Sequence, residues 1–206
     1  MNKLELISPS LFVSDRIAVV GSSGLLLGSN KGIIIDNFDD VVRFNRAPNE
    51  GFEDDVGSRT TIRVVNNHVF NNNKLPAKVW TNQPANFVRD LRYTKIVYFA
   101  GDGGPWNARA KNTDESCELY RFQFSLMNSL QSAVGYSGKP FTVGVGFIAT
   151  CVVSGVKPFV FGFDVEPRRR DHYWEDCPPP GGIHNRSAEQ ELLERLHEEG
   201  RIVLCP

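Results

Sequence analysis

The chain has 206 residues, of which 41% are hydrophobic, 11% aromatic and 23% charged, a composition that excludes a disordered or fibrous protein. This length favours a single domain spanning residues 1–206. Because 23 basic residues nearly balance 24 acidic ones, charge alone predicts neither nucleic-acid binding nor attraction to an anionic membrane.

Targeting and metal-binding signals do not stand out in the sequence. The apolar runs are far shorter than the roughly 20 residues of a transmembrane helix, and the first ten residues lack the core of a signal peptide. The cysteines, at positions 117, 151, 177 and 205, show no metal-ligand spacing. We therefore expect a cytoplasmic protein with reduced thiols and no transmembrane span, for which peripheral contact with the inner face of a membrane stays open.

Short apolar or β-branched runs recur along the chain and predict strands. They lie at residues 17–20, 33–35, 41–44, 61–65, 78–80, 96–99, 159–163 and 202–204. Most of them lack polar residues at alternate positions, as is typical of a parallel sheet that helices cover on both faces.

Three segments between these runs predict helices. Apolar residues recur every three or four positions over residues 119–134, and Gly135 is suited to end that helix. Residues 147–154 predict a buried helix, and Ser187 with Gln190 fits a capping box for a helix ending at Gly200. The alternation of strands and helices predicts a single α/β/α sandwich around a mostly parallel sheet.

The first candidate site is the turn after the strand at residues 17–20, where Gly21, Ser22, Ser23 and Gly24 follow one another. Small residues at the end of a strand let backbone N–H groups approach an anionic ligand closely. The spacing matches neither a dinucleotide-binding fingerprint nor a P-loop, so a purely structural turn remains the alternative.

The second candidate is the strand at residues 41–44, on which Arg43 and Asn45 share one face before Pro48 ends it. A solvated edge strand with a surface turn is the alternative.

The third candidate lies on both sides of a Pro/Gly loop. His172 and Tyr173 precede the loop, and His184 stands just before the predicted helix that carries Glu189 in its first turn. A neutral histidine beside a helix N-terminus suits a general base, and Glu189 could orient its ring. In the alternative, His184 is a loop residue and Glu189 only complements the helix dipole.

Taken together and in order, these regions resemble the motifs of glycosyltransferase family 29, the animal-type sialyltransferases. The matching stretches are residues 19–24, 43–48 and 51–61 for the large motif, 140–144 and 160–163 for the small motif, 172–175 for the third motif, and His184 with Glu189 for the terminal H-x-x-x-x-E motif.

The resemblance implies an inverting transfer of sialic acid, or of a related 2-keto acid sugar, from a CMP-activated donor to a glycan hydroxyl. It implies a GT-A-like fold without a D-x-D motif, and a reaction that needs no metal and no cofactor. His184 would be the general base, and His172 and Tyr173 would face the CMP phosphate.

The resemblance also implies the residues that bind the donor. They are Gly21, Ser22 and Ser23 of the first turn, Asn45 of the large motif, Thr142 and Gly144 against the cytidine, Tyr173 and Glu189. Ser22 stands where relatives usually have asparagine, and the disulfide that joins the large and small motifs in secretory relatives has no counterpart, since the positions hold Ile17 or Arg16 and Gly155. Two alternatives stay open: a CMP-Kdo-dependent transferase, and a CMP-binding protein without transferase activity.

Overall fold

The computed structural model describes residues 11–66, 95–100, 119–123, 127–163, 172–174 and 184–206. Its strands form one seven-stranded sheet in the order β5-β4-β3-β2-β1-β6-β7, in which every neighbouring pair is parallel. They are β1 (Ile17–Val20), β2 (Asp40–Phe44), β3 (Ile62–Asn66), β4 (Lys95–Ala100), β5 (Leu119–Gln123), β6 (Phe159–Phe161) and β7 (Val203–Cys205). The predicted strand at residues 78–80 lies outside the described residues.

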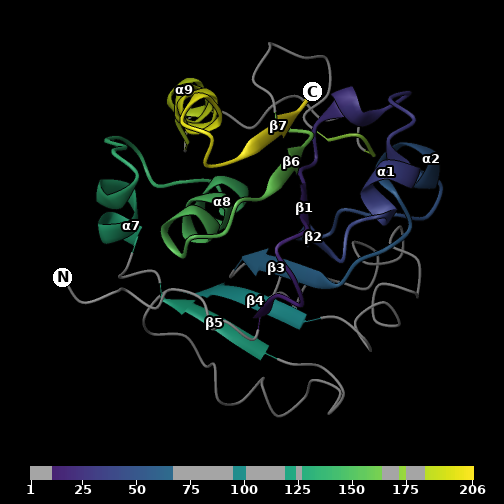
Figure 1. The fold of residues 1–206 in the computed structure, drawn as a ribbon, viewed down its shortest axis with the longest axis horizontal. Helices are drawn as coiled ribbons and strands as arrows, with labels where there is room; N and C mark the ends of the chain where they lie inside the picture. The colour runs from purple at the N-terminus through teal and green to yellow at the C-terminus, as the bar shows by residue number, and fades with distance from the viewer. Residues whose placement is uncertain (1–10, 67–94, 101–118, 124–126, 164–171, 175–183) are drawn as a thin grey trace, which may run out of the picture.

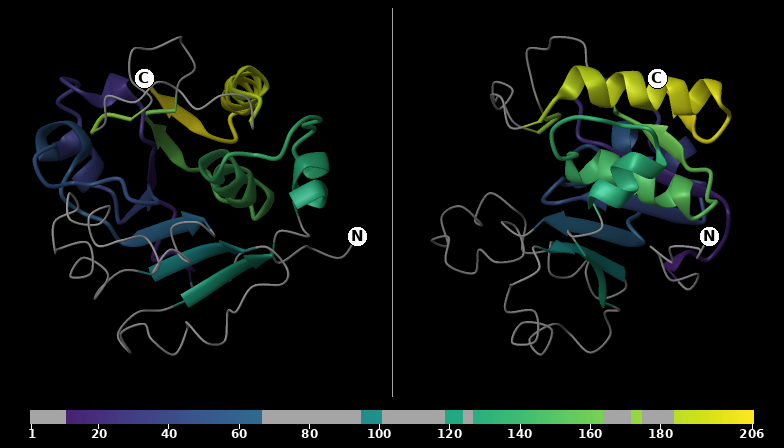
Figure 2. Two further views of the ribbon diagram at one scale, coloured as in Figure 1. Left: turned by 180° about the vertical axis from the view of Figure 1, so that it is seen from behind. Right: turned by 90° about the vertical axis from the view of Figure 1, so that its left-hand side faces the viewer.

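Helices cover both faces of this sheet, which confirms the α/β/α prediction. The short helices η2 (Gly24–Leu26), α1 (Gly32–Asp36) and α2 (Glu53–Val56) lie on one side. The other side carries α7 (Met127–Ala133), α8 (Val143–Val153) and α9 (Arg186–Glu198), as both views of Figure 2 also show. Among the described residues, no helix is both long and apolar enough to cross a membrane.

The unbroken apolar sequence of β1 suits a strand that lies between two layers of helices. Ile17 and Val19 pack into the core under α8 and α9, whereas Ala18 and Val20 pack into the core on the side of α1 and α2. All four side chains are buried. A strand with helices on both faces needs no polar side, as its sequence predicts.

The prediction for residues 33–35 is wrong, because these isoleucines lie in α1. Only Ile35 of the three is buried, while Ile33 and Ile34 are exposed. Parallel neighbours such as β1 and β2 need a crossover connection, so the chain between them leaves the sheet and forms a helix over its face.

The single helix predicted over residues 119–134 is also wrong in its first part. Leu119–Gln123 forms strand β5, which pairs with β4, and only Met127–Ala133 is helical. A short apolar run fits both periodicities, and pairing with the backbone of β4 decides between them. Gly135 does end the helix, with φ +65°.

Helices α8 and α9 also begin earlier than the sequence predicts. Thr142 caps α8, and Asn185, rather than Ser187, caps α9 by accepting a hydrogen bond from the backbone N–H of Ala188 at 3.3 Å. Ser187 thus lies inside the helix, because the amide of Asn185 already provides the cap. Gly200 follows the end of α9 as predicted.

Arg43 is fully buried in β2, a strand between β1 and β3, so the edge-strand alternative is wrong. Its guanidinium donates to the carbonyls of Val56, of Gly57 at 3.0 Å and of Arg59 at 3.1 Å. These bonds fasten the segment between α2 and β3 to the centre of the sheet. Arg43 therefore has a structural role, and only Asn45 of the predicted pair lies at the end of the strand.

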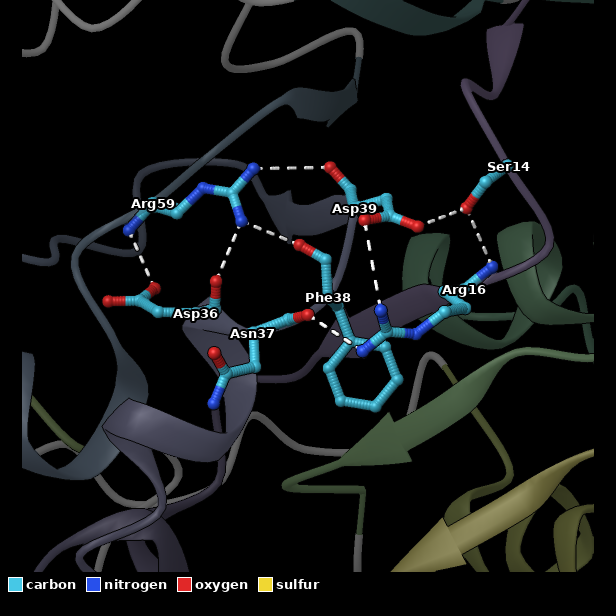
Figure 3. Close-up of polar contacts among 7 residues, drawn as sticks. All are labelled: Ser14, Arg16, Asp36, Asn37, Phe38, Asp39 and Arg59. Carbon is cyan, nitrogen blue, oxygen red and sulfur yellow. Dashed lines mark hydrogen bonds and ion pairs between the residues drawn. The ribbon is translucent and has the colours of Figure 1, made fainter.

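A second polar cluster joins segments at the edge of the sheet where β1 and β2 begin (Figure 3). The Asp36 carboxylate accepts from the backbone N–H of Ser58 and of Arg59 at 2.8 and 2.9 Å. The Arg59 guanidinium in turn donates to the carbonyls that end α1, among them that of Asp36 at 2.7 Å. These backbone bonds lower the pKa of Asp36 although its partial burial acts in the other direction. This part of the large motif supports the fold rather than the candidate site.

Candidate functional site

The direction of the strand connections reverses at β1. From β1 the chain proceeds outward through β2, β3, β4 and β5 on one side, and β6 and β7 lie on the other. In open α/β sheets, ligands bind at such a switch point, beside the carboxyl ends of the strands. The turns after β1 and β6 meet there.

The Gly21–Ser23 turn is bonded directly to the end of β6. The N–H of Gly21 donates to the Phe161 carbonyl at 2.7 Å, and the N–H of Ser23 donates to the Gly162 carbonyl at 3.3 Å. A Cβ on residue 21 would lie 2.3 Å from the Gly162 oxygen, so only glycine fits. Gly162 has φ +65°, which ends β6 two residues before the predicted boundary.

The two serines of this turn have different surroundings. The Ser23 hydroxyl accepts from the Leu25 N–H at 3.1 Å and so caps η2. Ser22 is half-buried, and its carbonyl accepts from the N–H of Tyr173 at 3.0 Å. The turn therefore holds the third motif beside the end of β1.

Asn45 follows β2 at the same edge of the sheet. Val20 pairs with Arg43 in the register, so the residues that follow β1 and β2 leave the sheet side by side. Asn45 has φ +48°, a conformation that asparagine tolerates well, and its N–H donates to the Val64 carbonyl at 2.8 Å. The contact of Asn45 with a nucleotide stays a prediction.

Thr142 forms the N-terminus of α8 at this edge. Its hydroxyl accepts from the Val145 N–H at 3.3 Å and donates to Oε2 of Glu189 at 3.0 Å. Its own N–H donates to Oε1 of Glu189 at 2.5 Å. We refer to these bonds between Thr142 and Glu189 as the Thr142–Glu189 clamp, which fixes the start of α8 to the first turn of α9.

Glu189 is buried, and both of its carboxylate oxygens accept hydrogen bonds from Thr142, so the predicted orienting effect on the His184 ring stays a prediction. Burial raises the pKa of Glu189, whereas the bonds from Thr142 and the charges of His184 and Arg186 oppose the rise. Through Thr142, the carboxylate fixes the chain just after Pro140.

His184 contacts that part of the chain itself. Its Nδ1 lies 2.9 Å from the Pro140 carbonyl oxygen, two residues before Thr142. A carbonyl only accepts hydrogen bonds, so Nδ1 carries the proton and, in the neutral ring, Nε2 carries the lone pair. This is the tautomer that a general base acting through Nε2 requires.

The third motif differs from the prediction at Tyr173. Its ring is buried and packs edge-on against Phe52, with ring centroids 5.1 Å apart, and its hydroxyl donates to the Pro48 carbonyl. Burial raises the pKa of Tyr173 to about 12. The side chain therefore faces the core and not a phosphate, and the backbone N–H on Ser22 is its link to the site.

His172 is half-buried and stacks on Trp174, with centroids 4.5 Å apart and ring planes within 1°. Because Tyr173 is fastened to Ser22, this stacked pair lies next to the first turn. Glu175 of the same motif lies outside the described residues.

Comparison with known proteins connects this arrangement to one family. The model of glycosyltransferase family 29 (sialyltransferase) matches residues 13–100. The chain is 36% identical over 225 residues to beta-galactoside alpha-2,6-sialyltransferase 2 of Rattus norvegicus, covering 91% of this chain and 41% of the relative. The human protein of the same name is 26% identical with the same coverage.

Over residues 13–100, the chain resembles glycosyltransferase family 29. It spans about two fifths of the length of these relatives, 41% in both cases. Solved structures add the fold: a mammalian sialyltransferase matches with a TM-score of 0.65 at 20% identity, over 97% of this chain and 72% of that one. A mammalian sialyltransferase in complex with Gal-beta-1-3GalNAc-ortho-nitrophenol matches with a TM-score of 0.64 at 21% identity, over 92% of this chain and 68% of that one.

Two further residues of this site were not predicted from the sequence as contributors. Pro140 acts through its backbone carbonyl, for which a side-chain motif gives no signal. Phe163 lies between Gly21 and Gly144. Its position directly after Gly162 was the available clue in the sequence. Among the residues that the structure describes, no group of three or more His, Cys, Asp or Glu side chains has the arrangement of a metal site.

Proposed function

We propose that this chain transfers sialic acid, or a related 2-keto acid sugar, from a CMP-activated donor to a glycan hydroxyl with inversion. The observation that carries the proposal is the hydrogen bond from Nδ1 of His184 to the Pro140 carbonyl, 2.9 Å long. It leaves Nε2 as a base at the edge of the sheet where the Gly21–Ser23 turn and the N-terminus of α8 also lie.

In the proposed step, the acceptor hydroxyl gives its proton to Nε2 of His184 while its oxygen bonds to the anomeric carbon of the donor sugar. The bond between that carbon and the phosphate oxygen breaks, and its electron pair leaves with CMP. Attack from the face opposite CMP gives the inverted product. A positioned imidazole contributes roughly 10²- to 10⁴-fold to such a reaction.

The negative charge that develops on CMP needs stabilisation from the chain. Backbone N–H groups at the N-terminus of α8 and in the Gly21–Ser23 turn are suited to this, because such groups bind phosphate without reorganising during the reaction. His172 can donate a further hydrogen bond to the phosphate. The clamp at Thr142 keeps the helix N-terminus in place as the charge grows.

A donor screen tests the proposal. CMP-sialic acid and CMP-Kdo are offered separately with galactoside acceptors, and transfer and donor hydrolysis are followed by mass spectrometry. We expect turnover of CMP-sialic acid, the donor for which the family supplies the support. Turnover of CMP-Kdo alone would change the donor and keep the chemistry, whereas tight CMP binding with neither transfer nor hydrolysis would leave only a nucleotide-binding protein.

We further predict that chelators leave the rate unchanged. The sequence has no D-x-D motif, and the groups assigned to the CMP phosphate are backbone amides and a histidine. The measurement is the transfer rate after EDTA treatment, with and without added Mn²⁺ or Mg²⁺. A strict requirement for either ion would contradict this part of the proposal.

A further inference from the structure

Phe163 lies between two backbone segments of the site and touches both. A Cβ on Gly21 would lie 2.9 Å from its Cδ2, and a Cβ on Gly144 would lie 2.6 Å from its Cε1. One edge of the ring therefore adjoins the Gly21–Ser23 turn, and another adjoins the first turn of α8. Contacts this close leave no room for even a methyl group on either side.

The ring also has firm support behind it. Phe44 at the end of β2 meets Phe163 edge-on at 5.8 Å between centroids and meets Phe147 of α8 at 6.1 Å. The carbonyl of Gly162, directly before Phe163, accepts from the Ser23 N–H. Phe163 is thus fixed to the core and to the first turn at once.

We infer that Phe163 is a spacer: its ring sets the separation between the Gly21–Ser23 turn and the N-terminus of α8, and so positions the backbone amides for one donor nucleotide. The inference rests on the proposed function and makes Phe163 a positioning residue. The Thr142–Glu189 clamp holds the start of α8 and so opposes a shift of this helix that would accommodate a change. The ring accounts for glycine at position 144, whereas Gly21 is required by the Gly162 oxygen as well as by the ring.

The test is CMP binding by isothermal titration to the 206-residue chain and three variants, Phe163→Leu, Gly144→Ala and the double variant. We expect each single variant to bind roughly tenfold more weakly, the effect of misplacing one hydrogen bond to a charged group. The double variant should bind at least as well as Gly144→Ala, because the smaller leucine makes room for the methyl group. If the losses of CMP affinity in the two single variants multiply in the double variant, the inference is overturned.

Phe12→Leu is the matched control. Phe12 is also half-buried against the same core and meets Phe147 edge-on at 6.2 Å, but it belongs to neither turn of the site. We expect a similar loss of thermal stability from both leucine variants and a loss of CMP affinity only from Phe163→Leu. Equal CMP affinity in the two would overturn the inference, while no binding by the wild-type chain would overturn the proposed function itself. If Phe163→Leu does not fold, Phe163→Met serves for the same comparison, because the methionine side chain is about as large as leucine and more flexible.

Discussion

Substituting His184 with alanine should lower the transfer rate by about 10²- to 10⁴-fold while CMP affinity stays nearly unchanged. The imidazole is assigned to the acceptor hydroxyl, whereas the groups assigned to CMP lie on the Gly21–Ser23 turn and α8. Single-turnover kinetics for the chemical step and titration calorimetry for CMP measure the two effects separately.

His197→Ala provides the control for this substitution. His197 is exposed and lies in the last turn of α9. Its Nδ1 lies 3.4 Å from the Ile202 carbonyl oxygen and 3.4 Å from the Leu204 nitrogen, both long contacts. We expect wild-type turnover from it. Retained turnover in His184→Ala would remove His184 from the role of base.

The second large effect is expected at Glu189. Glu189→Ala removes both acceptors from Thr142 and leaves its partly buried N–H and its hydroxyl proton without an acceptor, which costs about 1–3 kcal/mol of unfolding free energy. The start of α8 and Pro140 should then shift, and a displacement of this kind lowers kcat/KM by on the order of 10²-fold. Glu191→Ala, at an exposed position of the same helix, should change stability by less than about 0.5 kcal/mol.

Glu189→Gln keeps the size of the side chain and removes its charge. The same variant should change how stability depends on pH. Burial raises the pKa of Glu189 above its ordinary value of 4.5, so the folded state holds this proton more tightly than the unfolded state. Its contribution to stability is complete below 4.5 and declines as the pH rises through the folded-state pKa. Glutamine does not titrate, so Glu189→Gln should lose less stability than the wild-type chain over that rise, which urea unfolding at several pH values measures.

An element could be predicted from the sequence where its own residues determine its structure, and not where its neighbours in the fold determine it. Val19 and its neighbours in β1 are apolar on both faces, and a central parallel strand is the structure that buries both. Ile33 and Ile34 are equally apolar, yet they lie exposed on α1, because the crossover to β2 decides the backbone there. Likewise, the open edge of β4 determines that Leu119–Gln123 is a strand.

For the candidate site, the sequence indicated which residues lie near one another and not which contacts they make. The order of the motifs identified Thr142, His184 and Glu189, but the partner of Glu189 is 47 positions away, and that of His184 is 44 positions away. Tyr173 shows the opposite case: a polar aromatic in a motif suggests a ligand contact, and its depth in the core gives it a structural role. Such distinctions arise only when the chain is folded.

The bond between His184 and Pro140 also determines the route by which the proton can leave. A peptide oxygen is far too weak a base to receive the Nδ1 proton, so the imidazolium formed by transfer has no relay on that side. In the proposed reaction the proton must depart through Nε2, the same atom that collected it, once the glycosylated product has moved away. Regeneration of the free base is then coupled to product departure and to the entry of water or buffer, so a slow-leaving product would delay the next cycle even when the chemical step is fast.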